Sequence, residues 1–206
     1  MNFNEQFTNS RVVNVKRHLD SIGKRVTSII EFGCGVGNNI YFLRKHFPNI
    51  QITGLDVSKE SLAMAEKRYL YDPHIKFQPI DRKVVPGAVD LVFMNCVLQF
   101  IDEDEFPEIF EYLKNILKFN GTLAIYESNP LNLFTNLRTK MSEYSKNAAL
   151  VNPYDLVDKL TRTGFHFPDL NFIFFYPKFL SVLAPTEKFL SRLPLGAQYS
   201  IYATRK

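Results

Sequence analysis

An apolar run that breaks into closely spaced glycines constrains the fold of this chain more than any other feature. The stretch Ser28–Asn39 reads Ser-Ile-Ile-Glu-Phe-Gly-Cys-Gly-Val-Gly-Asn-Asn. Glycine lacks a Cβ and tolerates a positive φ, so a backbone of this composition can lie directly against a ligand. Apolar residues then recur at helical spacing from Ile40, and the first turn of a helix offers unpaired N–H groups and a positive dipole end. The sequence therefore predicts a ligand site at a strand-to-helix turn.

The spacing of these glycines differs from the dinucleotide-binding pattern Gly-x-Gly-x-x-Gly. Gly37 comes one position early, Asn38 stands where that pattern has glycine, and Glu31 precedes the first glycine. A second predicted strand, Gln51–Asp56, ends in a carboxylate that can accept hydrogen bonds from both hydroxyls of a ribose. Dehydrogenases and methyltransferases both place an acidic residue there, so Asp56 indicates an adenosine-type ligand without choosing between the two classes.

Further landmarks follow in order along the chain. Ile75–Asp81 reads as a third strand that ends in Ile80 and Asp81, a pair suited to an adenine ring face and its exocyclic amine. Val89–Asn95 is a nearly continuous apolar strand, as expected inside a parallel sheet. A predicted helix and a fifth strand come next, with a helix stop between them at Lys118–Gly121. Their ranges are Ile109–Leu117 for the helix and Thr122–Glu127 for the strand.

Together these landmarks resemble the class I S-adenosylmethionine-dependent methyltransferases, in the small bacterial type with a domain of the methyltransferase 11/12 kind. The resemblance runs motif by motif from Val26 to Glu127 and more loosely to the end of the chain. It implies an α/β, Rossmann-like fold: a seven-stranded, mostly parallel sheet with helices on both faces and an antiparallel C-terminal hairpin, at Phe172–Pro177 and Tyr199–Lys206. It also implies S-adenosylmethionine as cofactor and S-adenosylhomocysteine as product. The cofactor-binding positions that it implies are Glu31, Gly33, Cys34, Gly35, Gly37, Asn38, Asp56, Val57, Ile80, Asp81 and Asn95.

Methyl transfer requires mainly alignment of the nucleophile, the methyl carbon and the sulfur, which agrees with a sequence that shows no obvious catalytic triad. Three residues are candidates for a catalytic role. Asn95 is neutral and cannot act as a base, so we expect it to orient ligand or backbone. Glu127 ends the fifth strand, where it either takes a proton or holds an amine, or else makes a structural contact to a loop. His166 is a third candidate base, although its sequence position does not place it in the pocket.

Length and composition suit one domain over residues 1–206, with a helical cover at 1–25 and a substrate-pocket or lid insertion at 128–152. No basic and apolar leader is visible, so we expect a cytoplasmic protein. No apolar run is long enough for a spanning helix, although peripheral membrane contact stays open. The two cysteines lack metal-site spacing, which predicts no metal. The net charge of +4 comes from scattered basic residues, which makes nucleic acid an unfavoured partner. A monomer and a homodimer are both compatible with the sequence.

The acceptor stays open at this stage. We expect a small metabolite or a glycan-type acceptor first, a lipid-like acceptor second and nucleic acid third, with O, N or C as the methylated atom. The aromatic cluster within Phe165–Phe179 is either core or an apolar substrate or dimer surface, and Lys178–Leu193 is either a packed or an interfacial stretch. Two alternative functions remain. A nicotinamide-dependent Rossmann oxidoreductase would need the later glycine, and a catalytically silent cofactor-binding protein would show damaged motifs, whereas these look intact.

Overall fold

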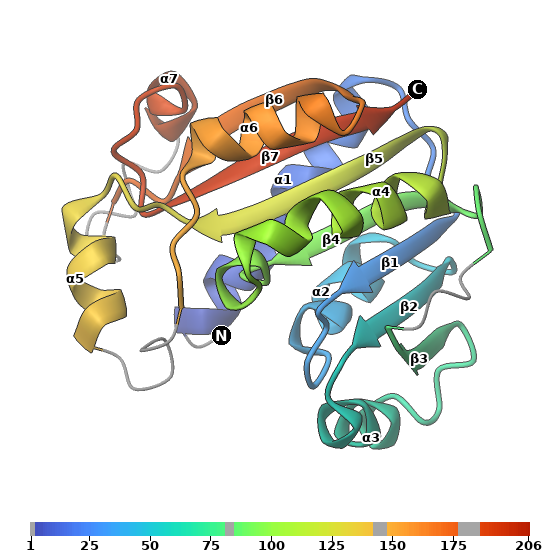
Figure 1. Ribbon diagram of the computed structural model, residues 1–206. Coiled ribbons are helices and arrows are strands. Elements are labelled where there is room, and N and C mark those ends of the chain that lie inside the picture. Colours follow the sequence, from blue (N-terminus) through green and yellow to red (C-terminus); the bar gives the residue numbers. More distant parts are fainter. Residues whose placement is uncertain (1–2, 81–84, 142–147, 177–185) are drawn as a thin grey trace. The chain divides into compact units, whose positions relative to one another are not determined.

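A computed structural model describes residues 3–80, 85–141, 148–176 and 186–206 (Figure 1). The helices are α1 (Phe3–Ser21), α2 (Asn38–His46), α3 (Lys59–Arg68), α4 (Phe106–Ile116), α5 (Leu133–Met141), α6 (Pro153–Arg162) and α7 (Glu187–Leu190), with 3-10 turns η1 (Leu98–Phe100) and η2 (Glu103–Glu105). The strands are β1 (Ser28–Phe32), β2 (Gln51–Asp56), β3 (Ile75–Pro79), β4 (Val89–Asn95), β5 (Leu117–Ser128), β6 (Phe165–Ile173) and β7 (Gln198–Arg205).

The described strands form a seven-stranded sheet in the order β3-β2-β1-β4-β5-β7-β6. β1 pairs in parallel with β2 and β4, and β2 pairs in parallel with β3. β6 and β7 are antiparallel. The predicted fold class, a Rossmann-like, mostly parallel sheet with an antiparallel C-terminal pair, is therefore confirmed. The chain divides into two compact units: a first unit of residues 1–94 and 115–122, and a second unit of residues 95–114 and 123–206. The assignment of all 206 residues to one domain stays a prediction.

The first unit is built on buried parallel strands. In the register, Glu31 of β1 lies opposite Gly54 of β2 on one side and Phe93 of β4 on the other. β4 is buried from Val89 through Met94, as its continuous apolar sequence predicts. Gly54 is needed because a Cβ there would lie 2.6 Å from the Phe77 ring and 2.8 Å from the Cys34 sulfur. β1 thus places the buried Glu31 directly before the glycine-rich loop.

The second unit is built on the antiparallel pair β6 and β7, against which α6 packs (Figure 1). α6 begins at the Asn152 cap, whose side chain accepts a hydrogen bond from the Tyr154 N–H at 2.9 Å. Inside this unit, the hydroxyls of Tyr126 and Tyr202 are hydrogen-bonded at 2.7 Å, and both rings are buried.

Two sequence-based expectations differ from the structure, and a third segment contains a helix that the sequence did not indicate. α4 ends at Ile116 and β5 starts at once, so Lys118–Gly121 belongs to the strand and is not a helix stop. β6 occupies Phe165–Ile173 and therefore starts seven residues before the predicted strand at Phe172. The connection 128–152 holds α5, where the sequence showed no clear periodicity. Residues 178–185, half of the predicted amphipathic stretch 178–193, lie outside the described residues, as does Pro177.

Candidate functional site

The glycine-rich loop after β1 is held against the end of β2. The N–H groups of Gly33 and Cys34 both donate to the Leu55 carbonyl, at 2.8 and 3.0 Å. Gly37 has a φ of 78°, and a Cβ there would lie 2.9 Å from the Tyr69 ring. Gly35 has a φ of 52°, but a Cβ there would meet nothing within 4 Å. Gly37 is thus required by packing, whereas Gly35 borders open space in which a ligand can lie.

Asp56 connects this loop to the next helix. Its Oδ2 accepts the Gly35 N–H at 2.7 Å, and its Oδ1 accepts the Ser58 N–H at 2.9 Å. Each carboxylate oxygen has a further lone pair, so Asp56 keeps the capacity to accept from hydroxyl groups. Val57 beside it is 81% exposed. The Ile80 N–H donates to the Asp56 carbonyl at 3.1 Å, which places Ile80 beside the same strand end.

Glu31 is a fully buried carboxyl group in the same unit. Its Oε1 accepts a hydrogen bond from the Asn39 side chain at 2.5 Å. Its Oε2 is buried and has no hydrogen-bond partner among the described residues. Burial raises the pKa of Glu31 to about 8, the hydrogen bond from Asn39 opposes this rise, and the charge of Asp56 adds to it. The carboxyl group is therefore arranged to receive a positive or hydrogen-donating ligand group.

Two other predicted positions of the loop have evident structural contacts. Cys34 is buried, and this burial, with the charges of Glu31 and Asp56, raises the pKa of its thiol well above the ordinary value. A thiol of this kind is a packing group, because the thiolate is the reactive form. Asn38 is exposed, and its Oδ1 accepts a hydrogen bond from Arg68 at 2.8 Å. Asp81 lies outside the described residues.

In the second unit, the chain turns sharply where β4 ends. Asn95 is partly exposed, yet its Oδ1 is buried and has no hydrogen-bond partner among the described residues. Cys96 has a φ of 56°, unusual for a residue other than glycine. Its N–H donates to the Tyr126 carbonyl at 2.8 Å, and its sulfur accepts from Gln198 at 3.6 Å. The turn is thereby fixed to β5 and β7.

Glu127 is 1% exposed at the end of β5. Its Oε1 accepts the N–H groups of Val97 and Leu98, each at 2.8 Å, and so caps the 3-10 turn η1. The Tyr199 hydroxyl donates to the Val151 carbonyl at 3.0 Å. Burial, followed by the charges of Glu127 and Cys96, raises the Tyr199 pKa well above its ordinary value. The structure therefore supports the loop-contact role of Glu127 that the sequence left open beside proton transfer.

His166 lies apart from this turn. It is exposed on β6 opposite Thr204, whereas Ile173 at the other end of β6 lies opposite Gln198, the residue that contacts Cys96. The intervening strand separates His166 from Gln198 by roughly 20 Å. We therefore leave His166 out of the proposed machinery.

Sequence reasoning missed Asn39, Gln198 and Tyr199 as parts of these two sites. Asn39 stands two residues after Gly37, and an amide in the first turn after the glycines was the available signal. Gln198 and Tyr199 come from β7, about a hundred residues after Cys96, so no local pattern could indicate their place.

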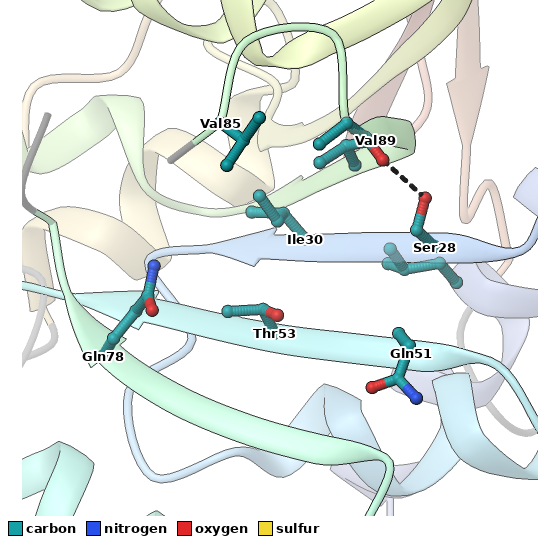
Figure 2. A pocket seen from close by; sticks show the side chains of 9 residues that line it. Ser28, Ile30, Gln51, Thr53, Gln78, Val85 and Val89 are labelled. Atoms are coloured by element: carbon teal, nitrogen blue, oxygen red, sulfur yellow. Dashed lines mark hydrogen bonds between the residues drawn. The ribbon is translucent and has the colours of Figure 1, made fainter. Parts of the chain in front are cut away.

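A separate hollow of about 290 Å³ opens on the sheet in the first unit (Figure 2). It is lined by Ser28, Ile29, Ile30, Gln51, Thr53, Gln78, Val85, Ala88 and Val89. The Ser28 hydroxyl lies within hydrogen-bonding distance of the Ala88 carbonyl at 3.1 Å and of the Asp90 carboxylate at 3.0 Å, so its single proton is shared between acceptors of the protein itself. The predicted site residues do not line this hollow, so it does not contribute to the glycine-loop site.

The family model and the two relatives described next are all named as methyltransferases. The model of a family described as a methyltransferase domain matches residues 30–123. The chain is 35% identical over 102 residues to trans-aconitate 2-methyltransferase from Enterobacter sp. (strain 638), covering 48% of this chain and 38% of that protein. It is 26% identical over 166 residues to malonyl-[acyl-carrier protein] O-methyltransferase 1 from Ilyobacter polytropus, covering 78% and 61%. The chain thus spans less than two thirds of the length of either relative.

Solved structures share the fold. A SAM-dependent methyltransferase from Archaeoglobus fulgidus matches with a TM-score of 0.69 and 16% identity, over 98% of this chain and 100% of that one. Haemonchus contortus phosphoethanolamine N-methyltransferase 2, in complex with S-adenosyl-L-methionine, matches with a TM-score of 0.67 and 20% identity, over 96% and 52%. Within the described part of the chain, no helix has the length and apolar character needed to cross a membrane. The same residues contain no group of three or more His, Cys, Asp or Glu side chains that could hold a metal ion.

Proposed function

We propose that this chain transfers a methyl group from S-adenosylmethionine to a small-molecule acceptor, because the methyltransferase-domain family model matches residues 30–123 and solved SAM-dependent methyltransferases share its fold. The observation that carries the proposal is the acidic glycine-loop site of the first unit. Its buried Glu31 oxygen lacks a partner among the described residues, and Gly35 borders open space. This set fits the cofactor, which presents a cationic amino group and two ribose hydroxyls.

The proposed roles follow from the chemistry of each side chain. Glu31 binds the amino group of the methionine part, and Asp56 accepts from the ribose hydroxyls. Val57 and Ile80 contact the adenine, and the backbone of Gly35 lies against the ligand. The bound cofactor supplies an electrophilic methyl group on its sulfonium. What the protein adds is alignment, because a fixed approach direction removes most of the entropic barrier to the transfer.

In the second unit, we assign to Asn95 an orienting role, through its unpartnered buried oxygen, and to Glu127 the positioning of the turn after β4. The acceptor class rests on the relatives, whose names give trans-aconitate and malonyl-acyl-carrier protein as substrates. A small metabolite or a glycan-type acceptor stays first in our order, with a lipid-linked acceptor second.

Two experiments test this function. Calorimetric titration with S-adenosylhomocysteine and NAD in parallel should show binding of the first and none of the second, and binding of NAD alone would overturn the proposal. Transfer of a tritiated methyl group should then be screened against metabolite, lipid and RNA extracts. Labelling of the metabolite fraction is the expected result. Cofactor binding without transfer to any fraction would instead support a catalytically silent protein, which the present relatives do not favour.

A further inference from the structure

Glu31 and Asn39 form a buried pair that leaves one carboxyl oxygen unused. Asn39 lies in the first turn of α2 and is 8% exposed, while Glu31 is fully buried at the end of β1. The Asn39 amide donates to Oε1 at 2.5 Å, and this bond fixes the carboxyl plane. Only Oε2 then remains to meet a ligand, because it has no partner among the described residues.

Among the described residues, the charge that acts most on Glu31 is negative. Asp56 at the end of β2 raises the pKa of Glu31, and Glu31 in turn raises the pKa of Cys34 in the loop and of Tyr69 at the end of α3. Each of these is neutral or negative. A buried carboxylate in such surroundings is costly, and its pKa of about 8 means that the carboxyl holds its proton at neutral pH.

We propose that Asn39 is a positioning residue for Glu31 and that the pair couples cofactor binding to the release of one proton. This inference rests on the proposed function, since the ligand that supplies the cation is S-adenosylmethionine or S-adenosylhomocysteine. On binding, the O–H bond at Glu31 breaks and its proton passes to the buffer. The carboxylate that forms pairs with the ammonium of the ligand, so that no other bond changes and the charge balances.

The test is calorimetry of S-adenosylhomocysteine binding in two buffers that differ in ionisation enthalpy. The difference in observed heat gives the number of protons released. At pH 7 the expected number is about 0.9, and at pH 9 it is about 0.1, as a group with a pKa near 8 requires. The association constant should rise about tenfold per pH unit between pH 6 and 7 and level off near pH 8.

Three variants separate a positioning role of Asn39 from a nonspecific effect of substitution on the structure. Glu31→Gln should bind weakly and release no proton. Asn39→Ala removes a hydrogen bond that favours the charged carboxylate, so its affinity should level off about one pH unit higher than that of the wild type. Lys45→Ala, at an exposed position on the same helix, is the matched control and should leave the proton count unchanged.

The outcomes are distinct. Binding of S-adenosylhomocysteine without proton release in the wild type overturns this inference and leaves the proposed function intact, whereas no binding at all overturns the proposed function. An unshifted pH profile in Asn39→Ala removes the positioning role. If Asn39→Ala does not fold, Asn39→Ser, which keeps a donor of shorter reach, replaces it and should show an intermediate shift.

Discussion

At the scale of single residues, Glu127 shows how a predicted catalytic group can be a positioning group. Its carboxylate accepts two backbone N–H groups from Val97 and Leu98. In Glu127→Gln the amide oxygen can still accept both, so we expect a loss of unfolding free energy below about 1 kcal/mol. Glu127→Ala leaves two N–H donors without this acceptor and should cost about 2–4 kcal/mol. Urea denaturation of both variants measures the difference.

An equal loss of unfolding free energy in Glu127→Gln and Glu127→Ala would contradict the capping role. Glu111→Ala is the control, because the ion pair of Glu111 with Lys114 is exposed and should be worth less than about 1 kcal/mol. Once an acceptor is known, near-normal kcat in Glu127→Gln would separate positioning from proton transfer. The sequence could place Glu127 at the end of a strand, but not its role, because its partners are backbone groups 29 and 30 residues earlier.

At the scale of elements, the glycine loop and the turn after α1 offer a matched pair of substitutions. Gly35 and Gly23 have φ of 52° and 66°, and a Cβ at either would meet nothing within 4 Å. Alanine at either position should therefore cost a similar backbone strain of about 1 kcal/mol. Only Gly35→Ala puts a methyl group where the cofactor is proposed to lie, so it alone should weaken S-adenosylhomocysteine binding, by roughly tenfold or more. Thermal unfolding and calorimetry check the two effects, and equal affinities would exclude Gly35 from the site.

The elements also show which part of the fold the sequence could predict. The predicted strands Gln51–Asp56 and Val89–Asn95 coincide with β2 and β4, because buried parallel strands have nearly continuous apolar sequences. The strand predicted from Phe172 begins seven residues after the start of β6. The reason is that the first half of β6 carries His166, Pro168 and Asp169, and that its pairing with β7 is irregular there. α5 was missed because its large apolar side chains are exposed and show no buried stripe. Those residues are Leu133, Phe134, Leu137 and Met141.

At the scale of the whole molecule, two carboxyl groups with opposite pKa shifts set the pH dependence of stability. Burial would raise the pKa of Asp90, but hydrogen bonds from Lys118, Thr27 and Ser28 outweigh it and lower this pKa to about 2. The folded state therefore holds the Asp90 carboxylate more strongly than the unfolded chain, whose pKa is near 3.8. This contributes about 2 kcal/mol above pH 4, lost as the pH falls toward 2. Asp90→Asn should lower the unfolding free energy at pH 7 and flatten its acid slope. A slope like that of the wild type would contradict this assignment.

Glu31 affects stability at higher pH than Asp90 does, and its effect on the unfolding free energy has the opposite sign. Its folded pKa of about 8 lies above the ordinary 4.5, so the unfolded chain loses this proton at lower pH than the folded protein does. Between these values the folded state binds more protons, and its stability must fall as the pH rises. We expect the ligand-free protein to lose up to about 4 kcal/mol of unfolding free energy between pH 5 and 8. Glu31→Gln should lack this decrease, because its amide does not titrate.

Saturating S-adenosylhomocysteine should reduce the decrease in stability in the wild type, because the bound ammonium stabilises the carboxylate. Urea titrations at pH 5, 6.5 and 8 measure all three slopes. A ligand-free wild type whose stability does not change over this range would show that Glu31 is already ionised, and that its burial is compensated without a ligand.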